Sequence, residues 1–135
     1  MTTETQPLFL PFAAMPKTGG IITAVVILFL VFDGVAKVLE VPAVVKASAQ
    51  LGLPPNVTGA IGILLLACTA IYASPRTAVL GAVLLTGYLG GATAIHVRAG
   101  NGAFPVAFSI ATGALAWLGL ILREPRLLLT ILLRQ

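Results

Sequence analysis

The sequence predicts an all-α membrane protein, an antiparallel bundle of four transmembrane helices. Of its 135 residues, 59% are hydrophobic and only 9% are charged, whereas about a quarter of an average soluble domain is charged. The apolar residues gather in four blocks, and a helix needs about 20 such residues to cross a bilayer. Because most breaks between the blocks are short, successive helices should be antiparallel neighbours. We therefore expect one membrane domain over residues 18–122.

The first element in the chain is an N-terminal tail, residues 1–17. It holds three prolines and shows no helical pattern, so we expect a loose segment. No basic residue precedes Lys17, and the apolar run after it is too long for the core of a signal peptide. This run should therefore be a retained helix, residues 18–41.

Three more apolar blocks follow, and each should span the membrane. They cover residues 57–73, 77–97 and 104–122. Proline-bearing, glycine-rich or charged segments, typical of loops, separate them. In the long connection before the second block, residues 44–51 are expected to form a short helix at the membrane surface. The final segment, 123–135, should be a cytoplasmic or interfacial tail, its end lying along the interface as a short amphipathic helix.

The end of the first predicted helix carries three charged residues, Asp33, Lys37 and Glu40. On a helix they share a stripe about 60° wide. Asp33 and Lys37 have the favourable spacing for an ion pair, with the acid four residues before the base. Asp33 lies about 22 Å along the helix from residue 18, inside a hydrocarbon core about 30 Å thick. Charges at such depth usually face protein or a water-filled cavity.

The third predicted helix ends in polar residues at the same outer level. His96 lies about 28 Å along that helix, level with Lys37. Arg98 follows it, and Tyr88 lies near mid-membrane. If the first and third helices are neighbours, these side chains form one polar cluster at the outer mouth of the bundle, a candidate ligand site. Its members are Asp33, Lys37, Glu40, Tyr88, His96 and Arg98. Alternatively, the charged residues anchor the interface and His96 is a structural histidine.

Small residues recur at four-residue spacing on the third and fourth helices. They are Gly87, Gly90, Gly91, Ala94, Ser109 and Gly113. Such residues let helix backbones approach closely in lipid. We expect close packing within the monomer, with a dimer face as the alternative.

Several kinds of site are missing from the sequence. There is one histidine and one cysteine, Cys68, too few for a zinc or haem site with several protein ligands. No nucleophilic triad, phosphate loop or dinucleotide motif occurs, so no catalytic residue and no cofactor is assigned. The basic residues form no patch, which excludes nucleic acid as a partner.

Four stretches resemble the DoxX-like family of small bacterial membrane proteins. They are FDGVAKV, LGLPPN, PRTAVLGAVLLTGYLGGATAIHVR and ALAWLGLILREPRL. The resemblance covers nearly all of the chain beyond residue 17, and it implies a four-helix bundle in the bacterial cell membrane. The wider DoxX family takes its name from a subunit of a membrane thiosulfate:quinone oxidoreductase. No activity or catalytic residue is carried over from the resemblance.

Two functions stay open at this point. One is a non-catalytic accessory or assembly subunit of a membrane redox system, which would have a redox protein as its partner. The other is a membrane protein that binds a quinone, a lipid or another small apolar molecule. If this protein also acted on the bound molecule, it would be an oxidoreductase. The small size and the lack of a redox centre favour the first function. The buried Asp33 and the nearby His96 favour the second.

The basic residues predict the topology of the bundle. One side holds Lys17, Arg76, Arg123, Arg126 and Arg134, and the other holds Lys46 and Arg98. Because Lys and Arg are enriched in cytoplasmic loops, reporter fusions at either terminus should read cytoplasmic, and a tag after Lys46 should read external. An external C-terminus would contradict this orientation.

Overall fold

The structure, a computed structural model, describes residues 16–132, which form six helices. They are α2 (Pro16–Val38), α3 (Pro42–Gln50), α4 (Val57–Ala73), α5 (Ala78–Ala99), α6 (Ala103–Arg123) and α7 (Pro125–Leu132). By length and composition α2, α5 and α6 can cross a membrane, and α4 is a shorter apolar helix. The four-helix membrane bundle is confirmed. Most of the predicted tail, residues 1–15, lies outside the described residues, as do residues 133–135.

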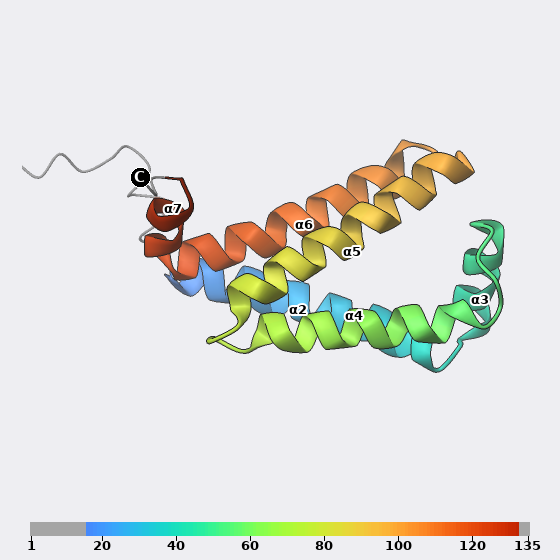
Figure 1. Ribbon diagram of the computed structural model, residues 1–135, viewed down its shortest axis with the longest axis horizontal. Coiled ribbons are helices and arrows are strands. Elements are labelled where there is room, and N and C mark those ends of the chain that lie inside the picture. Colours follow the sequence, from blue (N-terminus) through green and yellow to red (C-terminus); the bar gives the residue numbers. More distant parts are fainter. Residues whose placement is uncertain (1–15, 133–135) are drawn as a thin grey trace, which may run out of the picture.

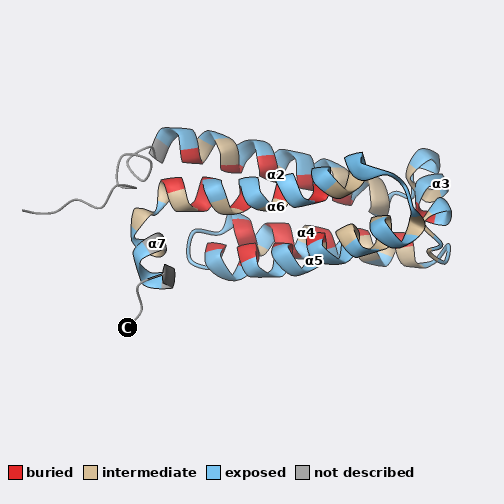
Figure 2. Ribbon diagram, turned by 90° about the horizontal axis from the view of Figure 1, so that it is seen from above, coloured by how far each residue is buried: buried red, intermediate tan, exposed pale blue. Residues whose placement is uncertain are grey.

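The four long helices form a ring in which each helix packs on two others (Figures 1 and 2). Helix α2 contacts α4 and α6, and α5 contacts the same two helices. The first and third spanning helices, α2 and α5, therefore lie diagonally across the ring. The polar cluster was predicted on the condition that these two helices are neighbours, and this condition is not met.

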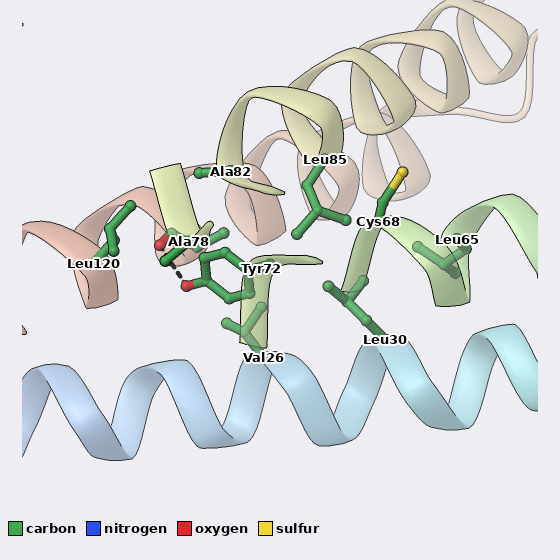
Figure 3. Close-up of a cluster of buried hydrophobic side chains, with 10 residues drawn as sticks. Val26, Leu30, Leu65, Cys68, Tyr72, Ala78, Ala82, Leu85 and Leu120 are labelled. Atoms are coloured by element: carbon green, nitrogen blue, oxygen red, sulfur yellow. Dashed lines mark hydrogen bonds between the residues drawn. The ribbon is translucent and has the colours of Figure 1, made fainter. Parts of the chain in front are cut away.

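The bundle is narrow at one end and wide at the other (Figure 1). Helices α2 and α4 form one pair, and α5 and α6 form another. The two pairs meet where α4 turns into α5, and they spread apart towards α3. We call these the narrow end and the wide end. Within the narrow half, the hydroxyl of the fully buried Tyr72 on α4 donates a hydrogen bond of 2.7 Å to the carbonyl of Ala116 on α6 (Figure 3).

Glycine contacts explain this shape. A Cβ atom at Gly19 of α2 would lie 2.8 Å from the carbonyl oxygen of Gly119 of α6, and one at Gly81 of α5 would collide with the backbone of Tyr72 on α4. Both contacts join the two pairs, and both are at the narrow end. Farther along, Gly62 brings α4 against Gly34 of α2, within one pair. The glycines thus hold the pairs together at the narrow end only.

The glycine cluster of α5 does not make the predicted close packing between the described helices. Gly87, Gly90 and Gly91 are exposed, and a Cβ atom at any of them would meet no other atom within 4 Å. Ala94 is also exposed. The reason is the rotation of α5, which turns a different face to the core. The buried residues of that face are Ala78, Gly81, Ala82, Leu85 and Leu89.

The small residues of α6 behave differently. A Cβ atom at Gly113 would lie 3.5 Å from Leu89 of α5, in ordinary contact. Ser109 is buried, and its hydroxyl donates to the Pro105 carbonyl of its own helix. A dimer face on the exposed glycines of α5 stays a prediction.

Two neighbouring glycines of α2 test the importance of close packing at the narrow end. Gly19→Ala should lower the free energy of unfolding by about 1–3 kcal/mol, because the new methyl group would strike the α6 backbone. Gly20→Ala is the matched control, since a Cβ atom there has open space. Melting in detergent would measure both variants. Equal melting temperatures would show that α2 and α6 do not depend on this contact.

Candidate functional site

A cavity of about 650 Å³ lies between the two helix pairs. Helices α2, α4, α5 and α6 form its walls, and residues of α3 line it at the wide end. Most of the lining is apolar, with Leu64, Ile95 and Phe108 among the contributors. The polar lining residues are Asp33, Lys37, Ser48, Thr58, Tyr88, His96, Ser109 and Thr112. The cavity has the size and lining of a site for a small apolar molecule.

An ion pair on α2 faces this cavity. The ammonium group of Lys37 donates a hydrogen bond to the carboxylate of Asp33, one turn earlier on the helix. The predicted pairing is therefore present. The two side chains are 19% and 34% exposed respectively. Gly62 lets the backbone of α4 pack against the aliphatic stem of Lys37. A Cβ atom at position 62 would lie only 2.7 Å from the Cβ of Lys37.

Glu40 does not share the stripe with this pair, because α2 ends before it. Its backbone is left-handed, with φ +50°. The Glu40 amide donates to the Lys37 carbonyl, and the Val41 amide donates to that of Ala36, at 3.2 and 3.1 Å. This pattern closes a helix at its C-terminus. Pro42 disfavours helical backbone at Val41, so the chain leaves α2 here and Glu40 is exposed.

Helix α5 supplies Tyr88 and His96 from the opposite side of the cavity. Both side chains are partly exposed. The Nδ1 atom of His96 is buried and has no hydrogen-bond partner among the described residues. No hydrogen bond joins His96 to Asp33 or Lys37 within residues 16–132. The predicted connected cluster is thus replaced by groups that face one cavity from two helix pairs.

Arg98 lies at the rim and does not line the cavity. It is exposed, and its Nη2 atom donates to the carbonyl of Leu51 at 3.4 Å. Leu51 follows α3 and lines the cavity. Arg98 therefore links α5 to the end of α3 across the wide end of the bundle.

Sequence reasoning missed the hydroxyl groups at the wide end. Thr58 in the first turn of α4 is only 1% exposed and lines the cavity, and its Oγ1 atom has no hydrogen-bond partner among the described residues. Ser48 of α3 is buried and also lines the cavity. The sequence offered one signal, which was position. Ser48 lies just before the second spanning helix and Thr58 at its start, near the outer membrane level predicted for Asp33. Ser109, Gly87 and Gly91, predicted as packing residues, are lining residues too.

Residues 16–132 contain no group of three or more histidine, cysteine or acidic side chains that could hold a metal ion. Cys68 is buried in the core, outside the cavity. The chemistry that the cavity offers is thus one ion pair, several hydroxyl groups and one imidazole in a largely apolar, open-sided space. Such a site can hold and orient an amphiphilic molecule.

Comparison with known proteins then decides the family. The family model described as "DoxX-like family" matches residues 21–119. The chain belongs to the DoxX-like family. Neither the curated proteins nor the solved structures gave a match. Every residue that lines the cavity, from Asp33 to Thr112, lies inside the matched region of this DoxX-like membrane protein.

A double-mutant cycle tests the ion pair. Lys37→Met should lower the free energy of unfolding by about 1–2 kcal/mol, because it leaves Asp33 charged and unpaired; the loss is below that of a fully buried pair because both side chains are partly exposed. Adding Asp33→Asn should recover part of this loss. Strictly additive effects in detergent melting would show that the two residues do not interact.

Proposed function

We propose that this DoxX-like protein binds one small apolar molecule with a polar head, a quinone or a single-chain lipid, between its two helix pairs. The observation that carries the proposal is the cavity of about 650 Å³ with its largely apolar lining. Binding pockets for small molecules usually measure about 300–1,000 Å³ and combine an apolar wall with a few placed polar groups. This cavity meets both criteria.

The lining supports an amphiphilic occupant over a purely hydrocarbon one. Side chains such as Leu64, Ile95 and Phe108 suit an apolar body. The ion pair of Asp33 and Lys37 offers polar contacts in the same enclosure.

The proposal includes a location. We place the protein in the bacterial cell membrane with both termini in the cytoplasm, on the basis of the basic residues in the loops and of the family. The narrow end then faces the cytoplasm, and the cavity opens towards the outer side. An occupant would enter from the outer leaflet or from the external medium.

Substitutions in the α5 glycine cluster test the proposal. Gly87→Leu and Gly91→Leu should fill the cavity without strain, because both positions line it and have open space for a Cβ atom. After gentle purification, mass spectrometry of the extract should find a quinone or lipid at near one per wild-type chain. We expect about tenfold less in each variant, which corresponds to about 1.4 kcal/mol.

Gly90→Leu is the matched control, since Gly90 has the same open space but does not line the cavity. It should retain the bound molecule at the wild-type level. Equal retention in all three variants would contradict binding in the cavity. A wild-type protein that carries no small molecule but co-purifies with a stoichiometric protein partner would support the accessory role in a redox complex instead.

A further inference from the structure

The cavity reaches the outer surface of the bundle along the flank between α4 and α5. These two helices diverge from their shared turn towards the wide end (Figure 1). Leu64 of α4 lines the cavity and is 55% exposed. On α5, Gly87 and Gly91 line the cavity and are also exposed. A Cβ atom at either glycine would meet no atom within 4 Å, so this part of α5 contributes no side chain that could fill the flank.

The rotation of α5 places its lining glycine Gly91 on the side of α4. Gly81 of α5 packs on Tyr72 of α4. Thr86 of α5 accepts a hydrogen bond from Trp117 of α6. At about 100° per residue, Gly91 lies about 80° from Gly81 and about 140° from Thr86 around the helix. It therefore belongs to the side of α5 that faces away from α6.

Leu64 occupies the corresponding side of α4. Gly62 packs against Gly34 of α2, and Leu64 lies about 160° from Gly62 around the helix. In the ring of helices α4 contacts α2 and α5. Because Leu64 faces away from α2 and still lines the cavity, it borders the same flank as Gly91.

The opposite flank, between α2 and α6, is closed by an aromatic pair. Phe29 of α2 and Phe108 of α6 make an edge-to-face contact, with ring centroids 5.2 Å apart. Phe108 lines the cavity, so this pair forms its wall on that side. Within residues 57–73 and 78–99, no aromatic pair and no side-chain hydrogen bond joins α4 to α5.

The open flank lies at the depth of the lipid tails. Gly87 and Gly91 are about 14 and 20 Å along α5 from its first residue, and Leu64 is about 14 Å from the last residue of α4. The hydrocarbon core is about 30 Å thick. A molecule that left by the wide end would expose its apolar chain to water, which is unfavourable. Through the flank, the chain stays in hydrocarbon throughout.

We propose that Leu64, Gly87 and Gly91 border a lateral portal, through which the bound molecule enters and leaves the cavity directly from the bilayer. The inference rests on the proposed function and adds the class of occupant. This is a molecule dissolved in the membrane, with a long alkyl or isoprenoid chain that passes between Leu64 and the glycines. Of the two routes of entry, it selects the lipid over the external medium.

A reversible cross-link across the portal tests the inference. Leu64→Cys with Gly91→Cys, in a Cys68→Ala background, places one thiol on each helix. A bis-methanethiosulfonate reagent, with the shortest spacer that links the pair, ties α4 to α5 through bonds that a reductant breaks. In lipid nanodiscs, native mass spectrometry would follow the exchange of bound monoolein, and separately of bound decylubiquinone, for a deuterated copy.

The link should slow uptake and release of the probe alike, by at least about tenfold, because the chain can no longer pass. A higher barrier changes both rates and leaves the equilibrium unchanged, so occupancy should stay within about twofold of the unlinked protein. Reduction of the link should restore the exchange rate. The probe with the higher occupancy in the unlinked protein identifies the source of the occupant, a lipid or a quinone.

Val25→Cys with Leu115→Cys, in the same Cys68→Ala background, is the matched control on the closed flank. Both residues are exposed, and neither lines the cavity. Val25 is one helical turn from Phe29, and Leu115 is two turns from Phe108. The same reagent would tie α2 to α6 and leave the aromatic pair in place. This link should leave the exchange rate of the probe unchanged.

Three results would overturn the portal. Unchanged exchange after linking Leu64→Cys to Gly91→Cys would place the route at the wide end. Equal slowing by both links would show that exchange needs the helix pairs to separate as a whole. Failure of every spacer to link Leu64→Cys to Gly91→Cys would show that these residues do not border one flank. The absence of both probes from the wild-type protein would instead overturn the proposed function itself.

Discussion

The close approach of helix backbones at the narrow end is the constraint on which the rest of the structure depends. Lipid tails are as apolar as leucine, so membrane helices associate through packing and hydrogen bonds. Here Gly19 packs on Gly119, and Gly81 packs on Tyr72. The hydrogen bond from Tyr72 to Ala116 adds a link across the ring. These contacts fix one end of each helix pair against the other pair.

The wide end forms because, away from the narrow end, the close contacts lie within each helix pair and not between the two pairs. Gly62 and Gly34 join α2 to α4 within one pair, and Trp117 of α6 donates to Thr86 of α5 within the other, at 2.7 Å. Each pair therefore has contacts of its own beyond the narrow end, while the two pairs spread apart at the far end. The resulting cavity receives Asp33 and Lys37, which explains how this pair is accommodated within a spanning helix. Residues of α3 line this end of the cavity, and Arg98 links α5 to the end of α3 there.

Much of this arrangement was accessible from the sequence. Helix bounds follow from apolar runs and their breaks: α4 has the predicted bounds, and α5 and α6 differ from them by one or two residues at each end. The pair of Asp33 and Lys37 follows from local helix geometry. Other features depend on tertiary structure. Whether a glycine faces a helix, a cavity or lipid depends on the rotation of its helix, so Gly87 and Gly19 look alike in the sequence.

The relation between helices, by contrast, could have been predicted. If successive helices are neighbours in a ring of four, the first and third helices must lie diagonally, and this places His96 across a cavity from Asp33. Helix α2 ends at Val38 because of Pro42 and the left-handed backbone of Glu40. Glu40 therefore does not share a helix face with Asp33 and Lys37, contrary to the prediction from the sequence. Thr58 lacked any charge or motif that would mark it, and only its buried, unpartnered hydroxyl distinguishes it.

The central claim is that the two helix pairs are joined at the narrow end and apart at the wide end. Distances between spin labels would test this claim most directly. One label pair would occupy the exposed positions Ala60 of α4 and Val97 of α5 at the wide end, and the other Ala70 and Leu84 nearer the turn, in a Cys68→Ala background. In lipid nanodiscs, the wide-end pair should give the longer mean distance. Equal distances for the two pairs would show parallel helices without an opening, and would contradict this account.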